Sequence, residues 1–202
     1  MTTLIIRGIE YQIDFKEDTH EYFVNGDKVP CVSNILSDVL SNNEPIPEYA
    51  MPAVKRGVLF HKIISLDLAG GVEVESIDEK LKGYWESYSL FKEEHVLVPK
   101  HIEQVMYNPI ENICMTLDYG GLYDTARSLL DWKTGGMYAK YKAQLGGYYR
   151  GALECFGYIP EIILDVQLFK NGKIAKPHIF EISECTQRWD SIYNVYGYKR
   201  EK

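Results

Sequence analysis

The stretch "GLYDTARSLLDWKTG", residues 121–135, places charged side chains inside two apolar runs. Asp124 interrupts the first run, Asp131 interrupts the second, and Lys133 follows Asp131 by two positions. Side chains alternate between the two faces of a strand, so Asp131 and Lys133 are expected on one face while Trp132 points to the other. The stretch therefore predicts a hairpin whose second strand carries an acid and a base side by side.

The register of this hairpin decides where Asp124 lies relative to Asp131. With strands at 121–125 and 128–133 and a loop of even length, Asp124 faces Asp131. Opposed side chains have Cβ atoms roughly 5 Å apart, and like charges at that distance are destabilising. A raised pKa, a basic neighbour or a bound divalent cation would offset the repulsion. A loop of odd length would shift the register by one, and a surface hairpin with solvated charges is the alternative interpretation.

Length and composition indicate a globular protein of one domain. The chain has 202 residues, of which 46% are hydrophobic and 25% charged, which is enough to bury a sizeable core. There is no apolar run of about 18 residues and no signal-peptide layout, so we expect a cytoplasmic protein without a membrane span. The cysteines are far apart and form no CxxC pair, which favours reduced thiols over a zinc site or disulfide framework: Cys31, Cys114, Cys155 and Cys185.

The net charge of −7 argues against a nucleic-acid partner, because phosphate contacts need lysine and arginine. The distribution of charge is more informative, since residues 132–153 contain no acidic residue. The same window carries four basic residues with tyrosines between them: Lys133, Lys140, Lys142 and Arg150. This pattern fits either a basic face for a polyanion or an ordinary helix with a solvated basic side.

The remaining elements follow from hydrophobic periodicity and turn signals. Residues 1–30 are expected to form short strands with a hairpin turn at Asn25-Gly26, and Asn171-Gly172 predicts a second turn. A loop is expected at 42–52. Helices are expected at 31–40, 53–69, 76–94, 138–156 and 186–197, and further strands at 101–107, 113–118, 161–169 and 174–182. This order describes one α/β domain with helices on the faces of a sheet.

Two of the predicted helices carry side chains that suit a site. His61 lies on the apolar stripe of helix 53–69, so its ring should face the sheet, either as a hydrogen-bonded core residue or as a metal ligand. Gln144 and Tyr148 are four positions apart and share a helical face. Gly147 and Gly151 cost about 1 kcal/mol each relative to alanine, which indicates close approach by another backbone or a ligand.

Together these features resemble the PD-(D/E)XK nuclease superfamily, in its RecB-like and phage-exonuclease branch. The motifs occur in the order of that family: "GVLFH" with His61, "GGLYD" with Asp124, "LLDWK" with Asp131 and Lys133, and "QLGGY", which matches the QxxxY signature. The opening "THEYFVNGDKVPCVSNIL" is similar to the hairpin and first helix of phage and prophage members. The resemblance covers about residues 17–170.

The resemblance implies a role for each matched residue. Asp124, Asp131 and Lys133 would be catalytic, and Lys133 would position or deprotonate the attacking water. Mg²⁺ or Mn²⁺ would be held by side chains and one backbone carbonyl: His61, Asp124, Asp131, the carbonyl of Trp132 and, as a further acid on the preceding strand, Glu103. The resemblance also implies residues that brace the site or contact DNA: Gln144, Tyr148, Lys140, Lys142 and Arg150. No iron–sulfur cluster is expected, because the cysteines include no close group.

The implied fold is α/β with a restriction-endonuclease-like core, in which helices flank a central mixed sheet and residues 1–30 form an N-terminal β-hairpin arm. Residues 1–202 would form a single PD-(D/E)XK nuclease-like domain. The implied function is a metal-dependent DNA exonuclease of phage or prophage type, serving recombination or repair. DNA and a single-strand annealing or binding protein are the implied partners, and homo-oligomerisation stays open. The alternatives are an inactive nucleic-acid-binding or inhibitory module and a resolvase-type endonuclease.

Overall fold

The computed structural model describes residues 1–41, 44–45 and 47–200. Its first sheet is an antiparallel meander of β1 (Thr2–Ile6), β2 (Ile9–Lys16), β3 (Glu21–Val24) and β4 (Asp27–Val29). The predicted turn at Asn25-Gly26 joins β3 to β4, and both residues have positive φ angles, 52° and 92°. Asparagine and glycine are the residues that accept this backbone most easily. The N-terminal strands therefore form as predicted, as a four-stranded sheet.

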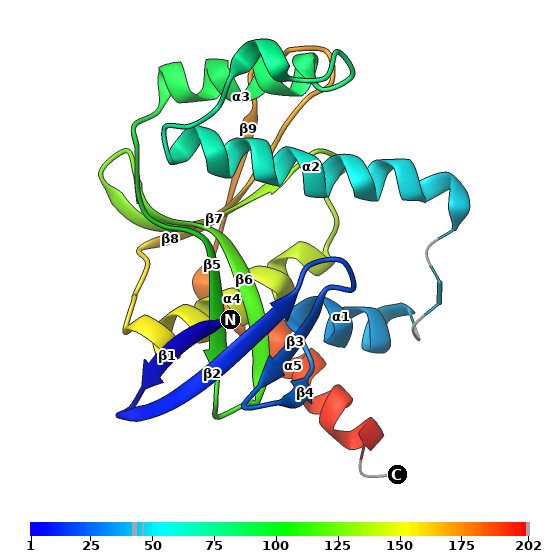
Figure 1. The fold of residues 1–202 in the computed structure, drawn as a ribbon, viewed down its shortest axis with the longest axis vertical. Coiled ribbons are helices and arrows are strands. Elements are labelled where there is room, and N and C mark those ends of the chain that lie inside the picture. Colours follow the sequence, from blue (N-terminus) through cyan, green and yellow to red (C-terminus); the bar gives the residue numbers. More distant parts are fainter. Residues whose placement is uncertain (42–43, 46, 201–202) are drawn as a thin grey trace.

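The second sheet is the centre of the molecule (Figure 1). Its strands lie in the order β5 (Leu97–Asn108), β6 (Ile113–Tyr123), β7 (Ala126–Lys133), β8 (Ile162–Gln167) and β9 (Lys176–Phe180). Only β7 and β8 pair in parallel within this sheet. A parallel pair needs a long crossover, which is supplied by α4 (Lys140–Phe156). The sheet is therefore mixed, as the resemblance implied.

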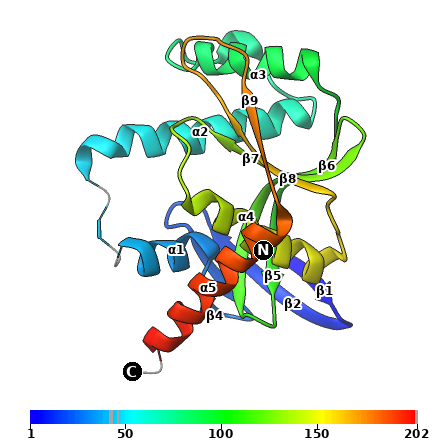
Figure 2. The ribbon, with the colours of Figure 1, turned by 180° about the vertical axis from the view of Figure 1, so that it is seen from behind.

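Helices cover both faces of the central sheet (Figures 1 and 2). α1 (Val32–Ser41), α4 and α5 (Ile182–Arg200) share one core cluster with Leu129 of β7. α2 (Met51–Leu68) and α3 (Lys82–Glu94) share another with the adjacent Leu130. Consecutive strand residues point to opposite faces, so β7 holds the two halves of the core together. No helix of the described residues is long and apolar enough to cross a membrane.

The N-terminal sheet packs against the central sheet. Buried residues of the meander, including Ile13 and Tyr22, share a third core cluster with Tyr107 and Cys114. The backbone N–H of Cys114 donates a hydrogen bond to the carbonyl of Pro30 at 2.9 Å. The first 30 residues are therefore joined to the core by packing and by backbone hydrogen bonding.

The structure differs from the sequence prediction most clearly in β6. The predicted strands 113–118 and 121–125 are one continuous strand, Ile113–Tyr123. A Cβ on Gly121 would lie 2.3 Å from the carbonyl oxygen of Val98 in β5. Glycine at this position therefore lets β5 and β6 approach closely, and the apolar run does not break there.

The continuous strand moves the hairpin register. Tyr123 pairs with Ala126 and Tyr119 with Leu130, so the loop has two residues, and Asp124 has a positive φ of 54°. Aspartate tolerates this backbone in tight turns. The prediction that Asp124 opposes Asp131 is wrong.

Three helices also differ from the prediction in where they begin or end. α3 begins at Lys82 instead of residue 76, because the side chain of Asp78 accepts a hydrogen bond from the backbone N–H of Lys80 and favours a turn there. α5 covers 182–200 instead of 186–197. α2 begins at Met51, inside the predicted loop 42–52, of which residues 42, 43 and 46 lie outside the described residues.

Candidate metal centre and active site

Three side chains from three elements meet at one point. His61 of α2, Asp118 of β6 and Asp131 of β7 each offer a ligand atom, and these atoms lie within 4.8 Å of one another. Asp118 is one position beyond the Tyr119–Leu130 pair, which brings it opposite Asp131. An imidazole nitrogen with two carboxylate oxygens is a donor set that suits Mg²⁺ or Mn²⁺. Of the described residues, this is the only such cluster.

His61 lies between Asp118 and the backbone of β7. Its Nδ1 is 3.1 Å from Oδ2 of Asp118, and its Nε2 is 2.7 Å from the carbonyl oxygen of Trp132. Burial opposes the charged form, but the negative charge of Asp118 and its hydrogen bond outweigh burial and raise the pKa of His61 to about 9. Without metal the ring is therefore an imidazolium that donates both N–H groups. Metal ligation through this ring requires the loss of one proton.

Asp118 is buried and stays ionised. Its Oδ2 also accepts a hydrogen bond from the backbone N–H of Trp132 at 3.2 Å. Burial alone would raise the pKa of Asp118, but the positive charge of His61 reverses the effect and lowers it to about 2. The sequence patterns did not point to Asp118, although a β6 strand that continued to Tyr123 would have placed it opposite Asp131.

Asp131 and Lys133 lie together in the buried end of β7. Oδ2 of Asp131 is 2.5 Å from Nζ of Lys133, whereas the buried Oδ1 has no hydrogen-bond partner in the described part of the chain. Burial raises the pKa of Asp131 well above its usual range; Lys133 opposes this rise and the charge of Asp118 adds to it. The free Oδ1 is the acceptor that a cation would satisfy, so these residues fit a divalent metal.

The QxxxY residues hold Lys133 in place. Lys133 Nζ donates to Oε1 of Gln144 at 3.0 Å and lies 4.1 Å from the ring centroid of Tyr141. Gln144 in turn donates from Nε2 to the hydroxyl of Tyr148 at 2.8 Å. Tyr148 is buried, with 6% of its surface exposed. This arrangement favours a bracing role for Gln144 and Tyr148 over contact with DNA.

A further acid, which the sequence analysis did not single out, lies on β8. Asp165 pairs with Asp131 in the parallel β7–β8 register and is fully buried. Burial raises the pKa of Asp165 to about 6, against the opposing positive charge of Lys133. Its only sequence signal was a single acid inside the apolar run "IILDVQL".

Asp124 does not join the cluster. It lies in the β6–β7 turn, at the end of β7 away from Asp131. Its Oδ2 is 3.0 Å from Nδ1 of His95, and its Oδ1 accepts a hydrogen bond from the backbone N–H of Val96 at 3.0 Å. The structure therefore supports a turn-stabilising position for this residue in place of the predicted metal and catalytic roles.

Glu103 lies on β5 at the rim of the cluster. It is flanked by the pairs Ile102–Tyr119 and Gln104–Leu117, which puts it across from Asp118. Its φ of 45° is unusual for a strand residue other than glycine. Partial desolvation and the charge of Asp118 raise the pKa of Glu103 to about 7. It adjoins the cluster of three without being one of its members.

The basic residues of α4 fall into two groups. Lys142 pairs with Glu184 at 2.7 Å and Arg150 with Asp190 at 2.9 Å, both on α5. The expected DNA-binding positions Lys142 and Arg150 are therefore already engaged within the protein. Lys140, by contrast, has no ion pair in the described part of the chain and has an exposed side chain.

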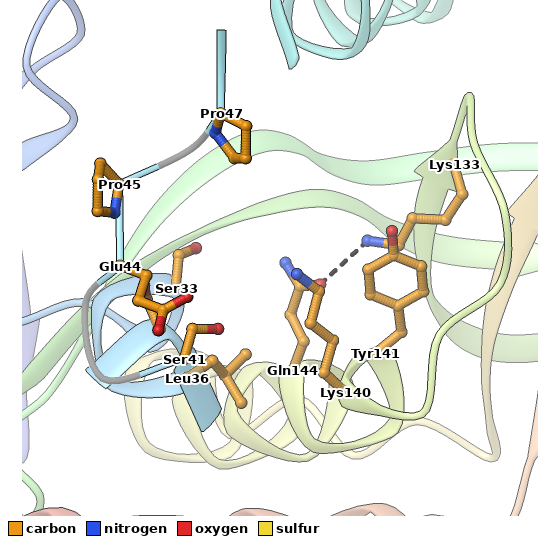
Figure 3. A pocket seen from close by; sticks show the side chains of 11 residues that line it. Ser33, Leu36, Ser41, Glu44, Pro45, Pro47, Lys133, Lys140, Tyr141 and Gln144 are labelled. Atoms are coloured by element: carbon orange, nitrogen blue, oxygen red, sulfur yellow. Dashed lines mark hydrogen bonds between the residues drawn. The ribbon is translucent and has the colours of Figure 1, made fainter. Parts of the chain in front are cut away.

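A groove of about 530 Å³ leads to Lys133 (Figure 3). Figure 3 shows Lys133 hydrogen-bonded to Gln144, with Lys140 and Tyr141 beside them and serines of α1 on the other side. The lining residues used below come from α1, β7 and α4: Ser33, Ser37, Ser41, Lys133, Lys140 and Tyr141. Hydroxyls, ammonium groups and an aromatic ring therefore share one concave surface.

No family model matches the chain, and no curated protein matches it either. Among solved structures, the chain is similar to an alkaline exonuclease, LHK-Exo, from Laribacter hongkongensis, with 12% identity and a TM-score of 0.35 over 82% of this chain and 87% of the other. A structure of LHK-Exo in complex with dAMP is similar at 12% identity and a TM-score of 0.33, over 86% and 90% of the two chains.

Proposed function

We propose that this protein is a divalent-metal-dependent DNA nuclease that hydrolyses phosphodiester bonds, of the exonuclease type and of phage or prophage kind. The observation that carries the proposal is the meeting of His61, Asp118 and Asp131 beside a buried lysine, Lys133. Two carboxylates and an imidazole can hold a divalent cation that activates water, and an ammonium group beside them can neutralise charge on a phosphate, both of which favour phosphodiester hydrolysis. The order of sequence motifs resembling the PD-(D/E)XK superfamily supports the same reaction.

The residues of the site divide the chemical tasks. His61, Asp118 and Asp131 would hold Mg²⁺ or Mn²⁺, with the carbonyl of Trp132 at the same edge. When bound, such a cation supplies a water of lowered pKa and neutralises charge on the phosphate. Lys133 adds a positive charge next to the reacting phosphate and holds the attacking water by hydrogen bonding. Gln144 fixes the direction of the Lys133 side chain.

The groove supplies a place for the substrate strand. Serine hydroxyls can donate to phosphate oxygens, as can Lys140, which has no ion pair with any residue that the structure describes. Tyr141 presents a ring for stacking against a base. These groups line the groove together with Lys133, and Nζ of Lys133 lies 2.5 Å from Oδ2 of Asp131, so a strand bound in the groove would run beside the metal cluster. Lys133 and Lys140 would supply local positive charge for a polyanion, beside the acid Glu44 of the same groove, in a chain whose net charge is −7.

The test compares linear duplex, single-stranded and closed circular DNA, each with Mg²⁺, Mn²⁺ or a chelator. The wild type is expected to release nucleotides from linear DNA only with metal, and Asp131→Asn is expected to cut at least about 10³-fold more slowly. Asp124→Asn is the matched control, an acid of the same hairpin outside the cluster, and should keep its activity. Cleavage of the closed circle would show an endonuclease, and a wild type that cuts none of the substrates would overturn the proposal.

A further inference from the structure

Asp165 is a buried acid to which the proposed hydrolysis gives no role. It is fully buried between Leu164 and Val166, which are also buried. Neither of its carboxylate oxygens has a hydrogen-bond partner in the described part of the chain. Burying an unpaired carboxylate is unfavourable, and strands of a parallel pair are usually apolar at such positions. An apolar residue would stabilise β8 better, so the acid lowers the stability of the fold.

The position of Asp165 relates it to Lys133. The β7–β8 register pairs Asp131 with Asp165 and Lys133 with Gln167. Strand alternation then places Asp131, Lys133 and Asp165 on the same face of the sheet, under α4. On its other side Asp165 pairs with His178 of β9, whose Nε2 is 3.3 Å from Oε1 of Gln167. Of the residues that the structure describes, Lys133 is thus the buried lysine on the face of Asp165.

Metal binding would change the surroundings of Lys133. In the structure Nζ of Lys133 is held by Oδ2 of Asp131 and by Gln144. A cation bound to Asp131 would compete with Lys133 for the negative charge of the Asp131 carboxylate, and it would repel the ammonium group of Lys133. Gln144 offers only a neutral oxygen, so it cannot offset this repulsion. A second carboxylate on the same face can.

We propose that Asp165 is a positioning residue, whose carboxylate keeps the ammonium group of Lys133 at the reacting phosphate while Asp131 serves the metal. The proposal rests on the proposed nuclease function. Asp165 acts through Lys133 and is outside the cluster formed by His61, Asp118 and Asp131. The carboxylate of Asp165 therefore attracts Lys133 from the β8 side of the site and does not bind the metal.

The experiment uses Asp165→Asn, which keeps the shape and removes the charge, and Ser128→Ala as a matched control. Ser128 is also fully buried and polar in the same sheet, at the other end of β7. For Asp165→Asn we expect kcat to fall about tenfold or more, while KM for DNA and the Kd for Mn²⁺ change less than about threefold. The unfolding temperature should stay the same or rise, because an unpaired buried acid has been removed. Ser128→Ala should leave kcat unchanged.

Each contrary result is decisive. An unchanged kcat overturns the positioning role. A loss of Mn²⁺ affinity as large as that of Asp131→Asn makes Asp165 a metal ligand. A fall in kcat that follows a lower unfolding temperature makes its role structural.

A double-mutant cycle separates this proposal from the proposed function, because it needs no catalysis. Asp165→Asn is combined with Lys133→Met, and unfolding midpoints in urea are measured without metal. If the two charges interact, Asp165→Asn raises the midpoint more in the Lys133→Met background than in the wild type. Equal shifts in both backgrounds overturn the proposal, even if the wild type cuts no DNA. A wild type that cuts no DNA but shows unequal shifts overturns the nuclease function and the catalytic purpose of the positioning, while the interaction of Asp165 with Lys133 stands.

Discussion

His61 and Asp118 form an ion pair across the gap between α2 and β6, with Nδ1 and Oδ2 3.1 Å apart. The contact joins α2, which packs in the core cluster shared with α3, to β6, on which Asp118 lies opposite Asp131. The same imidazole reaches the carbonyl of Trp132 through Nε2. The pair therefore sets the geometry of the candidate metal centre before any cation is bound.

The pair predicts a pH dependence of stability in the metal-free protein. The pKa of His61 in the folded protein is about 9, above the ordinary value of 6.5. The charged imidazole therefore contributes fully to the free energy of unfolding below pH 6.5, and this contribution is lost as the pH rises through about 9. The pKa of Asp118 is about 2, below its ordinary value of 3.8. The stabilisation by its carboxylate is therefore present above pH 3.8 and is lost as the pH falls through about 2. Between pH 6.5 and pH 10 the wild type should lose about 2–3 kcal/mol that His61→Gln does not lose.

Urea denaturation of both proteins at these two pH values, with a chelator present, measures the difference. Other groups titrate over the same range, and subtraction of the His61→Gln values removes their effect. Equal losses in the two proteins would show that His61 and Asp118 do not interact.

Lys140 and Lys142 provide a test of the groove. Lys140 lines the groove without an ion pair in the described part of the chain, whereas Lys142 is paired with Glu184. Lys140→Ala should raise KM for DNA about three- to tenfold and reduce the slope of log affinity against log salt by about 1. Lys142→Ala should change KM by less than about twofold. Steady-state kinetics at several salt concentrations compare the two, and equal effects would place the DNA elsewhere.

Gly146 and Gly135 test the packing that supports the site. A Cβ on Gly146 would lie 2.2 Å from the backbone carbonyl oxygen of Cys185 in α5, while one on Gly135 would meet nothing within 4 Å. Gly146→Ala should therefore lower the free energy of unfolding by about 1–3 kcal/mol. Gly135→Ala should change it by less than about 0.5 kcal/mol. Chemical denaturation measures both, and a neutral Gly146→Ala would contradict the close packing of α4 against α5.

The sequence predicted the parts of this fold that depend on local chemistry. The turn at Asn25-Gly26 has the positive φ angles that its residues favour, and the amphipathic helices form at their predicted positions with shifted ends. Asp131, Lys133, Gln144 and Tyr148 come together, because strand alternation and the helical repeat place them on facing surfaces. These relations need only the spacing of residues within one element and the element that follows it.

The features that local sequence patterns did not predict depend on contacts between distant segments. Asp124 was expected opposite Asp131 because the sequence pattern divides β6 in two, and the close approach of β5 that keeps β6 continuous involves Val98. The pairing of Lys142 and Arg150 with α5 is likewise invisible in the local pattern. Asp165 faces Asp131 only because β8 pairs with β7 after the α4 crossover, and spacing along the chain does not specify that register.

The proposed function requires that His61, Asp118 and Asp131 together bind one divalent cation. Isothermal titration calorimetry with Mn²⁺ tests it most directly, on the wild type, Asp118→Asn and Asp124→Asn. Mn²⁺ should bind to the wild type and to Asp124→Asn with affinities within about twofold, and Asp118→Asn should bind it at least about tenfold more weakly. A wild type that takes up no Mn²⁺, or a loss of affinity in Asp124→Asn with none in Asp118→Asn, would contradict the account.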